Sequence, residues 1–151
     1  MMRYWFLLLP LLFLPFATGC NNDPAGPPAL TGDTIRLPSG LRYITIKQGV
    51  GAPAVPGRSV GVHYTGYLAE DGTQFDTSFR ENGGPLTFVL NATGPAAPIR
   101  GFNDGILGMN VGGRRRLIIP ANLGYGEAGA PNIPANADLI FDVELFSVSS
   151  R

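Results

Sequence analysis

The chain has 151 residues, which is the size of a single domain. It carries 11 lysine and arginine residues against 11 aspartate and glutamate residues, so its charge gives no electrostatic reason to expect a nucleic-acid partner. One cysteine and one histidine are too few for a disulfide within the chain or for the usual zinc sites, and we expect neither a metal nor a cofactor.

The first 19 residues are expected to be a secretory signal peptide. Arg3 is the only charged residue before Asp23, and Tyr4–Phe16 is an apolar run broken by prolines. A positive start, an apolar stretch of about 7–15 residues and a small-residue cleavage region are typical of such a peptide. A permanent anchor helix is the less favoured alternative, because crossing about 30 Å of hydrocarbon takes about 20 apolar residues.

The end of the signal and the residue after it, Ala-Thr-Gly-Cys at Ala17–Cys20, resemble a bacterial lipobox. In that motif the cysteine becomes the lipidated first residue of the mature protein. An exported thiol with no partner would otherwise be open to oxidation. We therefore expect Cys20 to be lipidated and to attach the protein to a membrane of the cell envelope. The residue after Cys20 is Asn21. An Asp at this position would retain a lipoprotein at the inner membrane, so Asn21 favours the periplasmic leaflet of the outer membrane.

Residues 20–36 are expected to form a flexible tether that begins with the lipidated cysteine. Asn21–Leu30 is polar and contains three prolines and a glycine, a composition that cannot pack a core. The folded domain is then expected to cover residues 37–151.

Within that domain, short runs of strand-forming residues alternate with Gly, Pro and Asn clusters. Strands are expected over Leu41–Gln48, Ser59–Leu68, Leu117–Ile119 and Ala137–Val148. The last run is the clearest, because apolar and polar residues alternate in it with the period of two of a half-buried strand. Arg114–Arg116 precede the third run and are expected to be a solvated turn rather than a nucleic-acid patch.

One segment, Ile99–Met109, has the apolar spacing of a helix, although three glycines weaken it. The helix must therefore be held by packing on the sheet. These elements together predict an α+β fold, in which a twisted antiparallel sheet carries one short helix across a face.

The residues exclude most catalytic chemistry. A Ser-His-Asp hydrolase would have to use His63, which lies within the strand expected over Ser59–Leu68, and no Gly-x-Ser-x-Gly motif is present. A strand histidine bonded to its neighbours is the simpler interpretation. The remaining possibility for an enzyme is a reaction whose barrier is lowered by the environment of a pocket alone.

Seven motifs then follow one another in the order found in FKBP-type peptidyl-prolyl cis/trans isomerases. They are Val62–Leu68, Asp71–Ser78, Ile99–Gly105, Arg114–Pro120, Leu123–Gly126, Ile133–Ala137 and Leu139–Leu145. The resemblance covers about Leu37–Val148. It implies a half-barrel antiparallel sheet wrapped around one short helix, and an isomerase that acts on proline-containing polypeptides and assists the folding of exported proteins.

The resemblance also implies the site residues. The catalytic set would be Tyr64, Phe75, Asp76, Tyr125 and Phe141. Substrate would be bound by Leu86 at the mouth of the pocket, Phe88, Ile99, Ile133, and Phe102 as the floor beneath the proline ring. The family usually has tryptophan at the floor, so Phe102 is expected to weaken binding of the family's macrolide inhibitors. A binding module that holds proline peptides with little turnover stays open as the alternative.

The long N-terminal helices that dimerise some exported relatives have no counterpart in this sequence. We therefore expect a monomer.

Overall fold

The computed structural model describes residues 26–28, 30 and 32–149. The signal peptide over residues 1–19 and the lipidation of Cys20 lie outside the described residues and stay predictions. None of the helices in the described part is long and apolar enough to cross a membrane.

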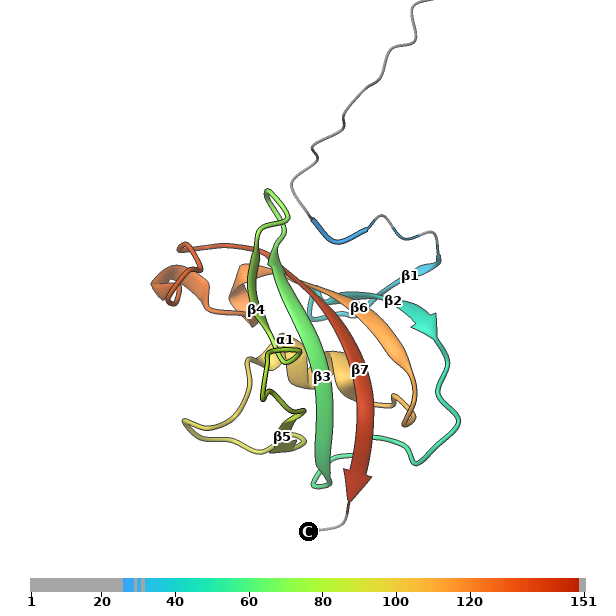
Figure 1. Cartoon of the computed structure of the whole chain (residues 1–151). Coiled ribbons are helices and arrows are strands. Elements are labelled where there is room, and N and C mark those ends of the chain that lie inside the picture. The colour runs from blue at the N-terminus through green and yellow to red at the C-terminus, as the bar shows by residue number, and fades with distance from the viewer. Residues whose placement is uncertain (1–25, 29, 31, 150–151) are drawn as a thin grey trace, which may run out of the picture.

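The fold is built on one antiparallel sheet of seven strands. These are β1 (Thr34–Arg36), β2 (Arg42–Lys47), β3 (Ser59–Leu68), β4 (Gln74–Thr77), β5 (Leu86–Val89), β6 (Arg114–Ile119) and β7 (Leu139–Ser149). Their order in the sheet is β1-β2-β6-β7-β3-β4, and β5 pairs with β3 beside β4. Figure 1 shows β3 and β7 side by side at the centre of the sheet, with the helix α1 behind them.

The two central strands confirm the period-two prediction. β7 pairs with β3 along its whole length, from Leu68 opposite Leu139 to Ser59 opposite Ser149. Alternate residues of β7 point to one face of the sheet, and those on the inner face are buried. They are Leu139, Phe141, Val143 and Leu145, each at most 4% exposed. The core therefore lies between this face and the helix.

The helix α1 spans Arg100–Ile106 and is shorter than the sequence predicts. It ends at Leu107, whose ψ of 131° leaves the helical range, and Gly108 with a positive φ of 72° completes the tight turn that follows. Its glycines set the packing distance. A Cβ at Gly101 would lie 2.4 Å from Cγ2 of Ile119, and one at Gly105 would lie 2.5 Å from Cδ1 of Leu117. Only glycine lets the helix lie this close to β6.

The sheet curves around α1, and the buried residues of both form a single core (Figure 1). Phe102 and Ile106 are the helix residues that enter the core, at 2% and 0% exposed. The expected α+β fold, with a half-barrel sheet around one short helix, is confirmed.

The expectation that Arg114–Arg116 form a solvated turn is wrong, because all three belong to β6. Arg116 is only 6% exposed and makes two 2.6 Å hydrogen bonds to the carboxylate of Asp142. Arg115 lies over the ring of Tyr43, 4.3 Å from its centroid. Nε of Arg114 lies 3.8 Å from Oε2 of Glu144, so each arginine has a partner on a neighbouring segment.

The carboxyl end of α1 is also held by Arg115. Its Nη1 donates hydrogen bonds of 2.9 and 3.1 Å to the carbonyl oxygens of Gly105 and Leu107. The last carbonyls of a helix have no partner within it, and a cation there is favourable. This contact helps to stabilise a helix whose glycines make it weak.

Part of the segment expected to be a tether is folded. Residues 34–36 form β1 and pair with β2, from Thr34 opposite Ile44 to Arg36 opposite Arg42. Further toward the N-terminus, the carbonyl oxygen of Pro28 accepts a hydrogen bond from Nη1 of Arg116. The packed structure therefore begins before residue 37.

Candidate active site

A pocket of about 110 Å³ opens at one side of the sheet, next to the start of α1. It is lined by Tyr64, Phe75, Asp76, Leu86, Pro98, Ile99, Phe102, Tyr125 and Phe141. Eight of these nine residues are among the ten that the family resemblance implies. Pro98 was not anticipated.

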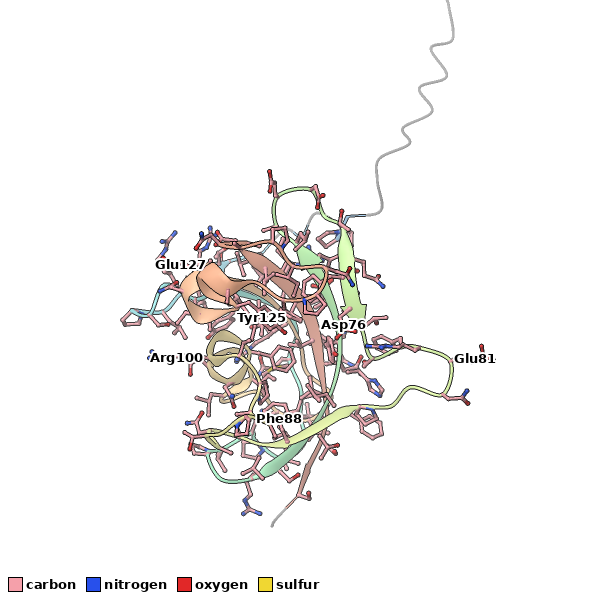
Figure 2. All side chains as sticks on the ribbon, turned by 90° about the vertical axis from the view of Figure 1, so that its left-hand side faces the viewer. Asp76, Glu81, Phe88, Arg100, Tyr125 and Glu127 are labelled. Atoms are coloured by element: carbon pink, nitrogen blue, oxygen red, sulfur yellow. The ribbon has the colours of Figure 1, made fainter. Side chains whose placement is uncertain are left out.

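The pocket residues come from segments far apart in the chain. Tyr64 lies on β3, Asp76 on β4 and Phe141 on β7, while Phe102 lies on α1. Tyr125 lies between two short 3-10 helices, η1 (Ala121–Leu123) and η2 (Gly126–Ala128). Figure 2 labels Asp76 and Tyr125 near the centre of the view, and both line the pocket.

Aromatic rings form the floor and two of the walls. Phe102 is 2% exposed, and its ring centroid lies 5.2 Å from that of Phe141 and 5.7 Å from that of Tyr64. Phe75 meets Phe141 edge to face at 5.5 Å. Edge-to-face packing is the favoured arrangement for aromatic pairs. These ring contacts make the floor and the adjoining walls of the pocket apolar.

A glycine in the middle of β3 makes room for two of these rings. A Cβ at Gly66 would lie 2.6 Å from Cζ of Phe75 and 2.8 Å from Cε1 of Phe141. The rings of the pocket wall therefore pack over the bare backbone of β3. The residue lies inside a motif of the family, but the sequence alone gave it no role, because a strand glycine more often marks a bulge.

One wall carries a polar pair. The hydroxyl of Tyr64 donates a 2.6 Å hydrogen bond to Oδ2 of Asp76. Oδ1 of Asp76 accepts a 2.9 Å hydrogen bond from the backbone N–H of Thr77 and also pairs with the guanidinium of Arg80. Burial, and then the hydrogen bond and charge of Asp76, raise the pKa of Tyr64 to about 12. The Tyr64 hydroxyl therefore keeps its proton at neutral pH.

Tyr125 supplies a second hydroxyl at the pocket. Its side chain is 38% exposed, which leaves it open to a bound ligand. Burial of part of the residue, and then the charge of Asp76, raise its pKa above the ordinary value for tyrosine. Tyr125 is therefore a hydrogen-bonding group that does not ionise at neutral pH.

Two residues that the resemblance assigns to substrate binding do not line the pocket. Phe88 is 9% exposed and packs behind the floor, with its ring 6.1 Å from that of Phe102. Ile133 is 6% exposed and exchanges two backbone hydrogen bonds with Ala130. Both are buried apolar residues of the core. Leu86 is 38% exposed and lies at the mouth.

His63 lies on the opposite face of β3 from Tyr64, away from the pocket. Its Nδ1 is 3.1 Å from Oγ of Ser78, and its ring stacks on Phe79 at 4.9 Å. The expectation of a strand histidine bonded to its neighbours is confirmed.

Within residues 26–28, 30 and 32–149, no three His, Cys, Asp or Glu side chains are grouped so that they could hold a metal ion. A larger hollow of about 330 Å³ lies beside the turn between β3 and β4. Its lining includes Leu68, Glu70, Pro134 and Asp138, and it has none of the expected site residues.

Residues 51–146 match the family described as FKBP-type peptidyl-prolyl cis-trans isomerase. The peptidyl-prolyl cis-trans isomerase FPR2 of Saccharomyces cerevisiae is 51% identical over 98 residues, which is 64% of this chain and 70% of that protein. An FK506-binding protein of Neisseria meningitidis serogroup B is 46% identical over 110 residues, 72% of this chain and 96% of that protein. Other curated relatives are longer, and the chain spans 30% and 38% of two of them.

Solved structures give the same result. The crystal structure of AtFKBP13 superposes with a TM-score of 0.68 at 36% identity, covering 78% of this chain and 99% of that one. The family match over residues 51–146 includes the helix and every residue of the pocket. The chain therefore belongs to the FKBP-type peptidyl-prolyl cis-trans isomerases.

Proposed function

We propose that this isomerase acts on X–Pro bonds of exported polypeptides at the cell envelope, and that its pocket lowers the barrier without moving a proton. The observation that carries the mechanism is the composition of the pocket. Aromatic and aliphatic side chains surround a single carboxylate, and that carboxylate is already hydrogen-bonded to Tyr64.

The physical reason lies in the amide bond. Resonance gives the C–N bond partial double-bond character and a rotation barrier of about 18–20 kcal/mol. At an X–Pro bond, both isomers are populated and exchange in tens to hundreds of seconds. Twisting the bond removes the charge separation of the planar amide. An apolar pocket solvates the planar dipole less well than water does, so it favours the twisted form.

The pocket residues then have separate roles. Phe102 lies under the proline ring, and Phe75 and Phe141 exclude water from the twisting bond. Tyr125 donates a hydrogen bond to the substrate backbone. Tyr64 and Asp76 hold each other and fix the polar wall. Each reduction of about 1.36 kcal/mol in the barrier is a tenfold gain in rate, so small differences in solvation matter.

The proposed location at the cell envelope rests on the sequence up to Asn21. A signal peptide followed by a lipidated Cys20 would place the domain on a membrane, with the periplasmic leaflet of the outer membrane favoured over the inner membrane. Secreted polypeptides that fold there would be the substrates.

A proline-binding module with little turnover is the second candidate, and the phenylalanine floor is the observation that favours it. Phe102 offers less contact area than the tryptophan usual in the family and no N–H group. A coupled protease assay on a proline tetrapeptide decides between the two. Isomerase catalysis at micromolar enzyme supports the proposed function. Binding of the peptide without catalysis would support the module.

A further inference from the structure

Ser78 follows the last residue of β4 and is buried although it is polar, with 7% exposed. Its hydroxyl accepts a 2.9 Å hydrogen bond from the backbone N–H of Tyr64. The same oxygen is 3.1 Å from Nδ1 of His63 and 3.3 Å from the carbonyl oxygen of Tyr64. The hydroxyl thus accepts one bond and has an acceptor for its own proton.

This hydroxyl replaces a missing backbone contact between β3 and β4. In an antiparallel ladder, opposed residues alternate between pairs that exchange two N–H···O bonds and pairs that exchange none. Tyr64 and Ser78 stand at a position of the first kind, next to the Thr65–Thr77 pair. The N–H of Ser78 donates to the carbonyl oxygen of Tyr64 at 2.9 Å, but the N–H of Tyr64 bonds to the Ser78 side chain. The carbonyl of Ser78 faces the following loop, where a Cβ at Gly83 would lie 2.5 Å from it.

The loop after β4 can therefore leave the sheet while Tyr64 stays paired. Figure 2 shows this loop standing away from the body of the molecule, with Glu81 at its tip. Without a side-chain acceptor at position 78, the departure of the loop would leave the N–H of Tyr64 with no partner.

The same strand end also holds the Tyr64 side chain. Asp76, two residues before Ser78, accepts the 2.6 Å bond from the Tyr64 hydroxyl. Tyr64 is thus held at its backbone by Ser78 and at its hydroxyl by Asp76. A shift of the strand end would move the carboxylate relative to the hydroxyl, and misplacements of about 1 Å are costly to catalysis.

We propose that Ser78 is a positioning residue for the isomerase reaction, which sets the Tyr64–Asp76 pair on the pocket wall. The proposal rests on the proposed function of that wall. The group responsible is the Ser78 hydroxyl, which accepts the hydrogen bond of the Tyr64 N–H. The apolar part of the Ser78 side chain has no role in the proposal.

A double-mutant cycle tests the proposal on the full chain. Ser78→Ala should lower kcat/KM on a proline tetrapeptide about tenfold, and Ser78→Thr, which keeps the hydroxyl, should retain most of the activity. In a Tyr64→Phe background, Ser78→Ala should change kcat/KM by less than about twofold, because no hydroxyl is left to position. An equal loss in both backgrounds would overturn the proposal and leave Ser78 a purely structural residue.

A spectroscopic measurement distinguishes a displaced Tyr64 hydroxyl from a variant that has lost its fold. The ¹³Cζ shift of Tyr64 in tyrosine-labelled protein at neutral pH reports its hydrogen bond to Asp76. It should move in Ser78→Ala and stay in Ser78→Thr, and an unchanged shift in Ser78→Ala would contradict the proposal. If the alanine variant does not fold, Ser78→Cys is the replacement test, because cysteine has a similar volume and its sulfur is a weaker acceptor. It should move the ¹³Cζ shift of Tyr64 and lower kcat/KM in the same way as Ser78→Ala. An inactive wild type would overturn the proposed function, whereas an active wild type with a fully active Ser78→Ala would overturn the role of Ser78 alone.

Discussion

The hydroxyl of Tyr64 donates a 2.6 Å hydrogen bond to Oδ2 of Asp76, across the pair of strands that forms one wall of the pocket. This bond joins the only carboxylate of the pocket to one of its two hydroxyls. The pKa of Tyr64, raised to about 12, keeps its hydroxyl protonated at neutral pH, and that hydroxyl already donates to the carboxylate of Asp76. The polar wall is therefore a fixed element of an environment that acts by solvation.

Replacing Asp76 should reduce catalysis more than stability. Asp76→Ala removes the partner of the Tyr64 hydroxyl, so kcat/KM should fall about tenfold or more. The thermal midpoint should move by only a few degrees, because the Asp76–Arg80 ion pair is exposed and exposed pairs contribute little. The pKa of Tyr64 should fall from about 12 but stay above its ordinary value, since burial remains. Full activity in this variant would show that Asp76 is not part of the site.

Enlarging the floor should tighten inhibitor binding. Phe102→Trp adds aromatic area and an N–H donor beneath the ligand, so the affinity for a macrolide inhibitor of the family should rise, as measured by calorimetry. Phe146→Trp is the matched control, because Phe146 is 59% exposed and packs on His63 outside the pocket. If the floor variant folds and binds no more tightly than the wild type, Phe102 is not the floor.

Turnover should be nearly independent of pH between about 6 and 8, where histidine ordinarily titrates. The raised pKa values of Tyr64 and Tyr125 keep both hydroxyls neutral there. His63 contacts Ser78 and Phe79 on the face of β3 away from the pocket, so it takes no part in the chemistry proposed here. The measurement is kcat/KM across this range for the wild type and for His63→Gln. A bell-shaped profile that disappears in the variant would indicate acid–base catalysis through His63.

Membrane association should depend on Cys20. Two or more acyl chains anchor a protein stably, at about 0.8 kcal/mol per buried CH₂ group. Cys20→Ala should abolish fatty-acid labelling and leave an uncleaved or soluble protein on fractionation. Labelling that survives the substitution would end the lipoprotein interpretation, and Ser39→Ala serves as a control outside the lipobox.

The parts of the fold that the sequence predicts are those with a strong local pattern. β7 could be predicted because its burial alternates along a strand packed on one face. The end of α1 could not, since it depends on the turn at Leu107 and Gly108 within a run of otherwise helical spacing. The role of Arg116 could not be predicted, because its partner Asp142 is distant in sequence. Its hydrogen bond to the carbonyl oxygen of Pro28 likewise follows from no local pattern.

The pocket residues could be predicted from the order of the family's motifs, but not from the residue types alone. A phenylalanine in the wall and one behind it look alike in sequence, so Phe88 could not be told from Phe75. Pro98 was missed because a proline before a helix has a structural explanation of its own. The role of Ser78 depends on the path of the β4–β5 loop, which no residue pattern specifies.

The central claim is that catalysis proceeds without proton transfer. Its most direct test is kcat/KM for a proline tetrapeptide in H₂O and in D₂O at matched pH equivalents, with the viscosity difference corrected. A reaction that only changes the solvation of a twisting amide should give equal values in the two solvents. A clearly lower kcat/KM in D₂O would contradict the account, because it would mean that a proton moves in the rate-limiting step.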